Sequence, residues 1–463
     1  MAMEDECLLK LLLPNSSWKL EKAVCSHGLF MMSPNHWDPL SRSFSRPLHL
    51  SLDDNGHAPP SSSVMVRIFH PQETPNALHV KVYNTGSVSL SSKEQETLLG
   101  QVARMLRLSD SDERNAREFE RIVSQESEES DYMKNFGGRV FRSPTLFEDM
   151  VKCILLCNCQ WPRTLSMARA LCELQWELQH CSSSISVAEK IEMENFIPNT
   201  PVGKESKRKV KMSKVATRLT SKIARIEVGL EEDLKLDNVG GTKEHVNLCS
   251  FQNNIEDDLH TLNELSVARL CLASEGREPY ACDRRIGNFP SPRELANLDE
   301  SFLAKRCGLG YRAVRILKLA QAIVEGRIQL NQLEEVCNEA SFTSYDKLAE
   351  QLSKIDGFGP FTCANVLVCM GFYHVIPSDS ETIRHLKQVH AKKSTVKTVQ
   401  MDVEAIYRKY APYQFLAYWS ELWHFYEQRF GKLSELPYAD YKLITASNMR
   451  IKRSCKVKKS KKC

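Results

Sequence analysis

The spacing of apolar residues changes from a strand-like to a helix-like period near residue 90. Before that point, short apolar segments alternate partially and are separated by Pro, Asn, Asp, Gly and Ser, which predicts strands over 64–69 and 77–83. After it, apolar positions three and four residues apart predict helices over 92–108, 114–124, 145–157 and 163–178. The pattern therefore predicts a mainly α chain that begins with a small antiparallel α+β domain.

The helical pattern fails over 181–258, where Ser, Lys, Glu and Asn are frequent and Phe196 and Phe251 are the only Phe, Tyr or Trp residues. A segment rich in these polar residues and poor in aromatics is typical of disorder, so a long, largely disordered insertion is expected. The predicted organisation is an N-terminal α+β domain at 1–108, a first helical part at 109–180, the disordered basic insertion at 181–258, a second helical part at 259–435, and a basic C-terminal tail at 436–463.

Charge is distributed unevenly along the 463 residues. The net charge of +4 includes +5 over 204–214 and +8 over 450–463, which leaves −9 for the remaining residues. Short basic runs of this kind are typical of nuclear import signals and of non-specific DNA-binding arms, and both interpretations apply here. The runs favour a nuclear protein.

The cysteine and hydropathy patterns exclude several other classes. The 16 cysteines are scattered and mostly have apolar neighbours, which is typical of reduced thiols inside the cell. Cys153, Cys157 and Cys159 have no second ligand pair at zinc-like spacing nearby, so no metal site is expected. No apolar run approaches the ~18 residues that a membrane span needs, so no membrane association is expected.

Residues 344–371 predict two helices joined by a glycine turn at 357–359. Pro360 suits the first position of the second helix, and Gly371 suits its end. The first amides of a helix have no partner within it, and with the helix dipole they can hold one phosphate without a side-chain cation. A plain helical hairpin without a ligand is the alternative interpretation.

Asp379 follows the second turn glycine by twenty residues. Ser378 or Asp379 is predicted to begin another helix, with Ser378 and Glu381 as a capping box. A simple N-cap, worth about 1 kcal/mol, is one interpretation of Asp379. The other is catalytic: an ionised carboxylate at a helix N-terminus can stabilise an oxocarbenium-like sugar and orient a water molecule.

With these motifs the chain resembles the helix-hairpin-helix (HhH-GPD) DNA glycosylases. The resemblance includes F-P-S-P-R-E-L-A-N-L-D and G-L-G-Y-R-A-V-R-I-L-K-L-A-Q-A-I-V-E-G before the hairpin, P-T-L-F-E-D-M-V-K-C-I-L-L-C-N-C-Q at 144–160, and Y-A-P-Y-Q-F-L-A-Y-W at 410–419. It implies the HhH-GPD fold and an enzyme of base excision repair that flips a damaged base out of duplex DNA and hydrolyses its N-glycosidic bond. The α+β domain resembles that of the alkylated-base and 8-oxoguanine glycosylases.

Phe361 stands where lyase-active members of this family have a lysine. Because phenylalanine cannot form a Schiff base, the resemblance implies a monofunctional hydrolase in which AP lyase activity is not expected. This favours alkylated bases, which are good leaving groups. An 8-oxoguanine-type glycosylase and a non-catalytic DNA-binding protein are the alternatives. Only Cys455 and Cys463 follow Asp379, so the C-terminal Fe–S cluster of the endonuclease III branch is not expected.

The resemblance also assigns site residues, with Asp379 as the catalytic one. The DNA-binding residues would be Gly357, Phe358, Gly359, Phe361, Thr362, Gln160 and Trp161, of which Gln160 and Trp161 would fill the gap left by the flipped base. The base pocket would be formed by Tyr418, Trp419 and Trp423, for which a packed helix face is the alternative. The expected partner is double-stranded DNA with damaged bases, bound by a monomer. No cofactor is required, although the family implies a monovalent cation at the hairpin.

Overall fold

The computed structural model describes residues 7–14, 18–52, 63–83, 89–125, 131–181, 285–337 and 342–449. All of them belong to one unit of the chain, formed by 1–187 and 283–463. The predicted insertion after residue 181, the resumption of helices near 259, and the basic runs at 204–214 and 450–463 lie outside the described residues.

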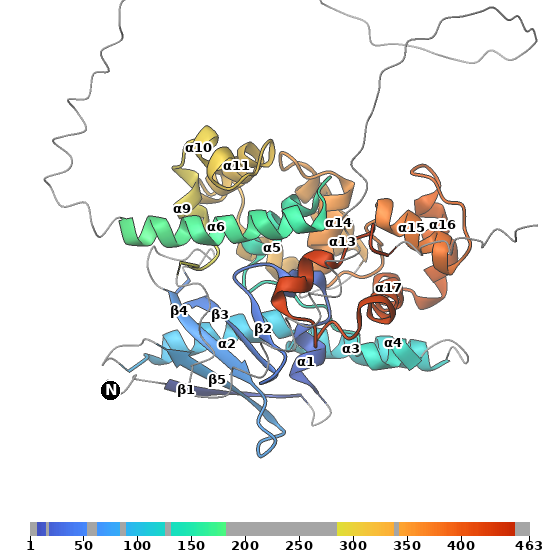
Figure 1. Cartoon of the computed structure of the whole chain (residues 1–463), viewed down its shortest axis with the longest axis horizontal. Coiled ribbons are helices and arrows are strands. Elements are labelled where there is room, and N and C mark those ends of the chain that lie inside the picture. Colours follow the sequence, from blue (N-terminus) through green and yellow to red (C-terminus); the bar gives the residue numbers. More distant parts are fainter. Residues whose placement is uncertain are drawn as a thin grey trace, which may run out of the picture. The chain divides into compact units, whose positions relative to one another are not determined.

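A five-stranded antiparallel sheet forms the N-terminal part (Figure 1), with the strand order β1-β5-β4-β3-β2. The strands are β1 Cys7–Leu12, β2 His36–Asp38, β3 Ser43–His49, β4 Ser63–Phe69 and β5 Ala77–Tyr83. Buried and half-buried residues alternate along β4, because successive side chains point to opposite faces of a sheet. The strands predicted over 64–69 and 77–83 are therefore confirmed.

Helices make up most of the rest, which confirms the predicted mainly α fold. The helices of the first part are α1 Leu20–Val24, α2 Ser92–Leu106, α3 Asp110–Gln125, α4 Asp131–Phe136, α5 Leu146–Leu156 and α6 Trp161–Cys181. Those of the second part are α9 Pro292–Ala296, α10 Glu300–Arg306, α11 Arg312–Val324, α12 Leu330–Cys337, α13 Phe342–Ser353, α14 Pro360–Met370, α15 Ser380–Val389, α16 Val399–Tyr407 and α17 Gln414–Phe430. Short 3-10 turns lie at Gly28–Met31, Arg408–Tyr410 and Tyr438–Leu443. None of the described helices has both the length and the apolar composition that crossing a membrane requires.

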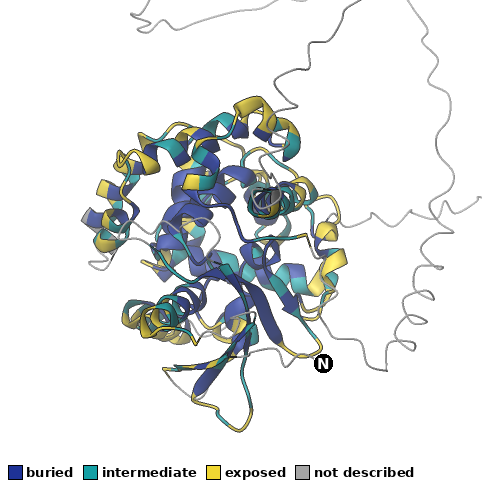
Figure 2. Cartoon of the chain, turned by 90° about the vertical axis from the view of Figure 1, so that its left-hand side faces the viewer, coloured by how far each residue is buried: buried dark blue, intermediate teal, exposed yellow. Residues whose placement is uncertain are grey.

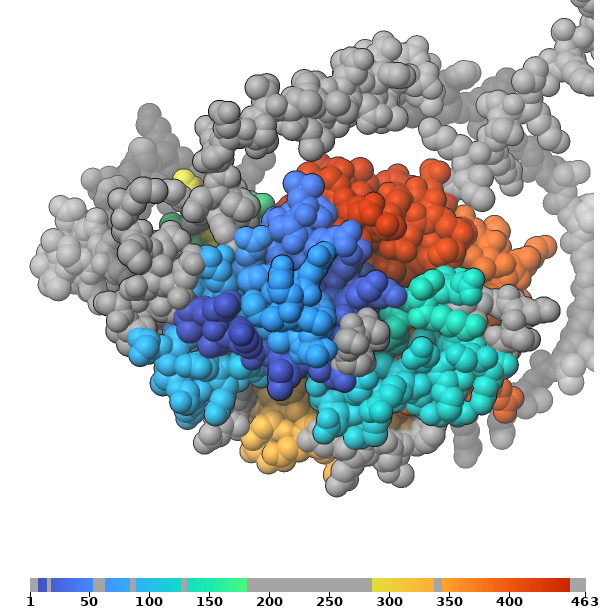
Figure 3. Space-filling model, turned by 90° about the horizontal axis from the view of Figure 1, so that it is seen from below, coloured from blue at the N-terminus to red at the C-terminus, as the bar shows by residue number. Residues whose placement is uncertain are grey.

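The sheet and the helices share one apolar core. Figure 2 shows the buried residues gathered where strands and helices meet, with exposed residues on the outer helix surfaces. Helix α2 contacts β1 and β3, and α5 packs against α6, α11 and α14. The chain after α17 returns to the N-terminal part (Figure 3), where the Trp37 indole donates a hydrogen bond of 2.8 Å to the Ser434 carbonyl.

A buried ion cluster joins the sheet to α5. Arg46 on β3 makes two hydrogen bonds with the carboxylate of Glu148, at 3.1 and 2.8 Å. The Lys152 ammonium lies 2.7 Å from the same carboxylate, and the side chains of Arg46 and Lys152 are fully buried. Burial alone would raise the pKa of Glu148, but the two cations outweigh it and lower that pKa to about 2. Glu148 is therefore ionised, and it offsets two charges that cannot reach water.

Candidate functional site

The predicted hairpin is present between α13 and α14. Gly359 is the N-cap of α14, Pro360 is its first residue, and Gly371 follows its last turn with φ of +102°. Gly357 has φ of +89°, a left-handed conformation that glycine adopts without strain. The Phe358 side chain points into the junction and is 5% exposed. The hairpin backbone thus needs its glycine at 357.

The two turn glycines have different surroundings. A Cβ atom at Gly357 would lie 2.4 Å from Cδ of Arg315, because this side chain lies across the turn. A Cβ atom at Gly359 would meet nothing within 4 Å. Phe361 and Thr362 follow in the first turn of α14, whose amides have no partner within the helix. The open space at Gly359 leaves this N-terminus accessible.

Thr362 directs its side chain inward and not toward the open end of the hairpin. It is 2% exposed, and its Oγ1 lies 3.0 Å from Sγ of Cys157, at the end of α5. Phe361 is half-buried. Of these two predicted DNA-binding residues, Thr362 can therefore offer only its backbone, and its side chain holds the loop after α5 beside the hairpin.

The loop between α5 and α6 contains the predicted wedge residues. Gln160 is exposed, whereas the Trp161 indole donates a 3.0 Å hydrogen bond to the Tyr441 carbonyl. Asn158 is exposed and has φ of +47°, and its carbonyl accepts a 3.3 Å hydrogen bond from Arg312. Trp161 is thus anchored to the C-terminal part of the fold, and the side chains of Asn158 and Gln160 extend into solvent.

Sequence reasoning did not single out the start of α11, which contacts both of these features. The Tyr311 ring is 47% exposed and has the guanidinium groups of Arg312 and Arg315 at 4.6 and 4.8 Å from its centre. Arg312 donates to the carbonyls of the α5–α6 loop, and Arg315 lies against Gly357. The sequence did contain a signal for this cationic surface, because two arginines three residues apart follow the glycines of the G-L-G-Y-R-A-V-R segment.

Asp379 is the N-cap of α15. Its Oδ1 accepts hydrogen bonds from the amides of Glu381 and Thr382, at 2.9 and 3.0 Å, and from the Thr382 hydroxyl at 3.2 Å. The Thr382 hydroxyl also accepts from the Asp379 amide, which completes a capping box. The predicted capping box of Ser378 and Glu381 is wrong, because Ser378 lies before the cap and donates to Gln400 instead.

The second carboxylate oxygen of Asp379 receives no hydrogen bond from the described residues, and the residue is open to solvent. Although the residue is exposed, the protein around its carboxylate excludes part of the water, and this desolvation raises the pKa of Asp379; the negative charge of Glu381 adds to the rise. Hydrogen bonds from Thr382 and Glu381 oppose the rise only partly. The hydrogen bonds of the cap therefore do not bring the pKa of Asp379 below that of an ordinary aspartate.

Tyr418 is the one predicted pocket residue that the structure connects to Asp379. Its ring is buried, and its hydroxyl lies 3.0 Å from Oγ1 of Thr382, the hydroxyl that also binds Asp379. Burial raises the pKa of Tyr418, and the nearby Asp379 charge raises it further. Tyr418 therefore stays neutral and fixes Thr382 from behind.

Trp419 and Trp423 lie on the same helix, and Trp419 contacts the N-terminal part. Their ring centres are 5.6 Å apart, and Trp419 stands 4.6 Å from the His27 ring while its indole donates to the Ser26 carbonyl at 2.8 Å. Trp423 is 8% exposed. Trp419 is half-buried and Trp423 is buried, as expected for the alternative interpretation of a packed helix face.

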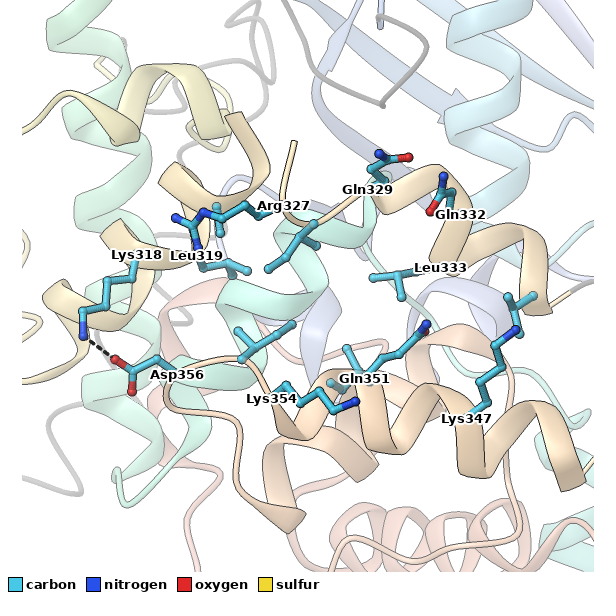
Figure 4. A pocket seen from close by; sticks show the side chains of 15 residues that line it. Lys318, Leu319, Arg327, Gln329, Gln332, Leu333, Lys347, Gln351, Lys354 and Asp356 are labelled. Carbon is cyan, nitrogen blue, oxygen red and sulfur yellow. Dashed lines mark hydrogen bonds and ion pairs between the residues drawn. The ribbon is translucent and has the colours of Figure 1, made fainter. Parts of the chain in front are cut away.

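A pocket of about 770 Å³ lies between α11, α12 and α13, beside the hairpin (Figure 4). Its floor is apolar, and Lys318, Arg327, Lys347 and Lys354 stand around it. Lys318 forms an ion pair of 2.6 Å with Asp356, next to Gly357. Asp379 and the predicted base-pocket residues do not line it, so this pocket and the Asp379 site are separate features.

Comparison with known proteins identifies one curated relative. No family model matches the chain. The chain is 25% identical over 172 residues to a protein of Saccharomyces cerevisiae named N-glycosylase/DNA lyase, and it spans 43% of that relative's length and 34% of its own. This similarity confirms the resemblance to the helix-hairpin-helix DNA glycosylases.

Two solved structures resemble the chain at lower identity. A 3-methyladenine DNA-glycosylase from Archaeoglobus fulgidus matches with a TM-score of 0.49 and 13% identity over 90% of this chain and 98% of its own. An 8-oxoguanine glycosylase/lyase of Clostridium acetobutylicum with bound DNA matches with a TM-score of 0.38 and 13% identity over 81% of this chain and 87% of its own. Likeness at this level does not indicate a substrate.

The yeast relative overturns one prediction. Phe361 led to the expectation that AP lyase activity is absent, but the relative is named for a lyase activity as well as a glycosylase activity. The physical weakness of the prediction is that a single hairpin position was taken to decide the chemistry. Phenylalanine at one position cannot itself form a Schiff base, but it does not prevent an amine elsewhere from doing so.

Proposed function

We propose that this chain, a relative of the helix-hairpin-helix DNA glycosylases, is a DNA N-glycosylase that removes a damaged base from duplex DNA. The observation that carries the proposal is the arrangement of Asp379. Its carboxylate is fixed through one oxygen at the start of α15, has its other oxygen open to solvent, and follows the hairpin glycine by twenty residues. A plain N-cap does not require this hairpin before it.

The proposed grip on DNA combines the N-terminus of α14 with the start of α11. The backbone N–H groups of Gly359, Phe361 and Thr362 would bind one phosphate, helped by the helix dipole, while Pro360 has no N–H to contribute. Arg315 beside Gly357 supplies a cation at the same turn, and the exposed Tyr311 ring extends that surface. Gln160, on the loop that Thr362 holds beside the hairpin, would enter the space left by a flipped base.

Replacing Gly359 with Ala tests this grip. The variant is expected to fold as the wild type, because its φ of −80° suits alanine and a Cβ there meets nothing within 4 Å. The methyl group would nevertheless occupy the space in front of the amides, so the Kd for duplex DNA is expected to rise about tenfold or more, by loss of a charge-assisted hydrogen bond. Fluorescence anisotropy at fixed salt measures this change.

Gly357→Ala is the matched variant. Its Cβ would collide with Arg315 and its φ of +89° is unfavourable for alanine, so this variant is expected to lose thermal stability as well as DNA affinity. Normal DNA affinity in a folded G359A protein would contradict the proposed phosphate grip.

The proposed chemistry is stabilisation of a sugar cation by Asp379. As the bond between the base and C1′ of the sugar breaks, positive charge develops on the sugar ring, and the free oxygen of Asp379 would lie against it and orient the incoming nucleophile. Thr382 and Tyr418 are positioning residues, because they fix the bound oxygen and touch nothing that reacts. A raised pKa places the acid limit of activity above that of an ordinary aspartate.

Thr382→Val is expected to slow base release about fivefold, because it removes the hydroxyl between Asp379 and Tyr418, a hydrogen bond worth about 1 kcal/mol. Thr382→Ser keeps that hydroxyl and is expected to restore the wild-type rate and its pH profile. Single-turnover base release across pH distinguishes positioning from a general loss of folding. Equal rates for the Val and Ser variants would contradict the positioning role.

The class of damaged base is a separate question. The sequence argument for alkylated bases depended on the absence of lyase chemistry, so it no longer applies once that prediction is corrected.

The proposed partner remains double-stranded DNA bound by a monomeric protein, and the two basic runs support the nucleus as the site of action. If the family's monovalent cation binds here, backbone carbonyls of the turn before α14 would hold it. The ion would supply positive charge next to the phosphate.

The decisive experiment uses the full chain and a panel of duplexes, each with one alkylated or one oxidised base. Base release is followed by chromatography, strand cleavage by electrophoresis with and without alkali, and Schiff-base formation by borohydride trapping. The proposal expects release from at least one lesion duplex and none from undamaged DNA. Tight binding to all duplexes without any release would support the alternative of a DNA-binding protein.

A further inference from the structure

Two histidines and a glutamate converge between α15 and α17, where the His385 ring lies 5.7 Å from the ring of Tyr418. Nε2 of His385 lies 2.6 Å from Oε1 of Glu421, and Nε2 of His390 lies 2.7 Å from the same oxygen. One ligand atom from each residue lies within 4.8 Å of the other two. His385 is on α15, His390 is its C-cap, and Glu421 is on α17, so two packed helices fix the group.

A hydrogen-bond network alone leaves this group crowded. The Tyr407 hydroxyl also donates to Oε1 of Glu421, at 2.8 Å, so three donors converge on one oxygen. A carboxylate oxygen has about two lone-pair sites. A cation between the three residues would remove the crowding, because both imidazoles would then face it with unprotonated nitrogens and only Tyr407 would still donate to the carboxylate.

We propose that His385, His390 and Glu421 form a binding site for a divalent transition metal, Zn²⁺ by preference. Two imidazoles and one carboxylate suit this borderline ion, with water as a fourth ligand. Zinc bonds of about 2.0–2.2 Å require ligand atoms about 3.3 Å apart, so each of the two His–Glu distances must lengthen by less than 1 Å, and the two His nitrogens, which lie within 4.8 Å of each other, must adopt the same spacing. The His385 side chain is fully buried and that of His390 is 25% exposed, which leaves an entry path on one side.

The role of this metal would be structural. It would tie α15 to α17, next to Tyr407 of α16, at the opposite end of the helix whose N-cap is Asp379. The sequence signal was weak, because H-L-K-Q-V-H places the histidines five residues apart and Glu421 follows thirty-one residues later. The proposal does not depend on the glycosylase function, since it concerns metal binding and stability only.

Cobalt substitution tests the site in the full chain. After dialysis against chelator, one equivalent of Co²⁺ is expected to give tetrahedral d–d absorption without a thiolate charge-transfer band, which separates this site from the 16 cysteines. Zn²⁺ is expected to displace the cobalt and raise the Tm. His390→Gln should lose the spectrum and the Tm increase, and His424→Gln, on α17 outside the cluster, should keep both.

The wild-type titration alone can overturn the proposal. A wild-type protein that binds no cobalt, or binds it only with thiolate character, excludes the site. Retention of the sulfur-free spectrum in a folded His390→Gln protein excludes these three residues as its ligands. Because the first result needs no variant, the test holds even if a substitution prevents folding.

Discussion

Asp379→Asn is expected to bind lesion-containing duplex with near wild-type affinity and to release base at least about 100-fold more slowly. The amide cannot offer a negative charge to the sugar cation, and an acid–base or electrostatic group of this kind contributes about 10²–10⁴ in rate. Asparagine is as good an N-cap as aspartate, so α15 is expected to remain capped. Single-turnover base release and anisotropy, measured on the same duplex, separate the loss of chemistry from a loss of binding.

The stability of the Asp379 variant carries independent information. A carboxyl whose pKa is raised on folding favours the folded state at acid pH, and this contribution disappears as the pH rises through the folded-state pKa. At neutral pH the charge is therefore a cost to folding, and Asp379→Asn should have a Tm no lower than that of the wild type. Asp299→Asn is the matched control, because Asp299 caps α10 in the same way and is exposed. The Asp299→Asn variant is expected to keep full activity. Base release at the wild-type rate by Asp379→Asn would contradict the proposed mechanism.

Local signals predicted the parts of this site that depend on neighbouring residues. As expected, α14 begins at Pro360 and ends before Gly371. A proline at the first helical position and a glycine after the last turn favour these helix ends through their own backbone conformation. The sequence left the cap of α15 open between Ser378 and Asp379, because both are good N-cap residues, and the structure places Asp379 there. Periodicity and capping residues thus located these helices, and only the partner of the capping box, Glu381 in place of Thr382, was predicted wrongly.

Periodicity and capping residues could not predict the side-chain contacts between segments that are far apart in the sequence. Thr362 turns inward because Cys157 is there to receive it, 205 residues earlier in the chain. Trp161 is fixed by the carbonyl of Tyr441, 280 residues later. Arg315 lies across Gly357 only after α11 and the hairpin have packed together. Side-chain direction at a helix end is set by the partner segment, and a single sequence does not identify that partner.

Glu148→Gln is expected to lower the free energy of unfolding by about 3–5 kcal/mol. The substitution keeps the shape of the side chain but leaves the fully buried cations of Arg46 and Lys152 without their counter-charge. The three residues lie at the junction of β3 and α5, so the loss affects the packing of the sheet against the helices. Urea unfolding followed by circular dichroism measures the change, and Glu118→Gln, in an exposed ion pair with Arg121, should leave the midpoint unaltered.

The pH dependence of that difference identifies its cause. Folding lowers the pKa of Glu148 to about 2, so its stabilising contribution is complete above the pKa of the unfolded glutamate, about 4.3, and is lost as the pH falls toward 2. The gap between wild type and Glu148→Gln is therefore expected to stay constant from about pH 7 to 5 and to narrow below about pH 4.3. A gap that persists unchanged into that acid range would mean that the variant is destabilised by altered packing and not by the loss of the charge at the sheet–helix junction.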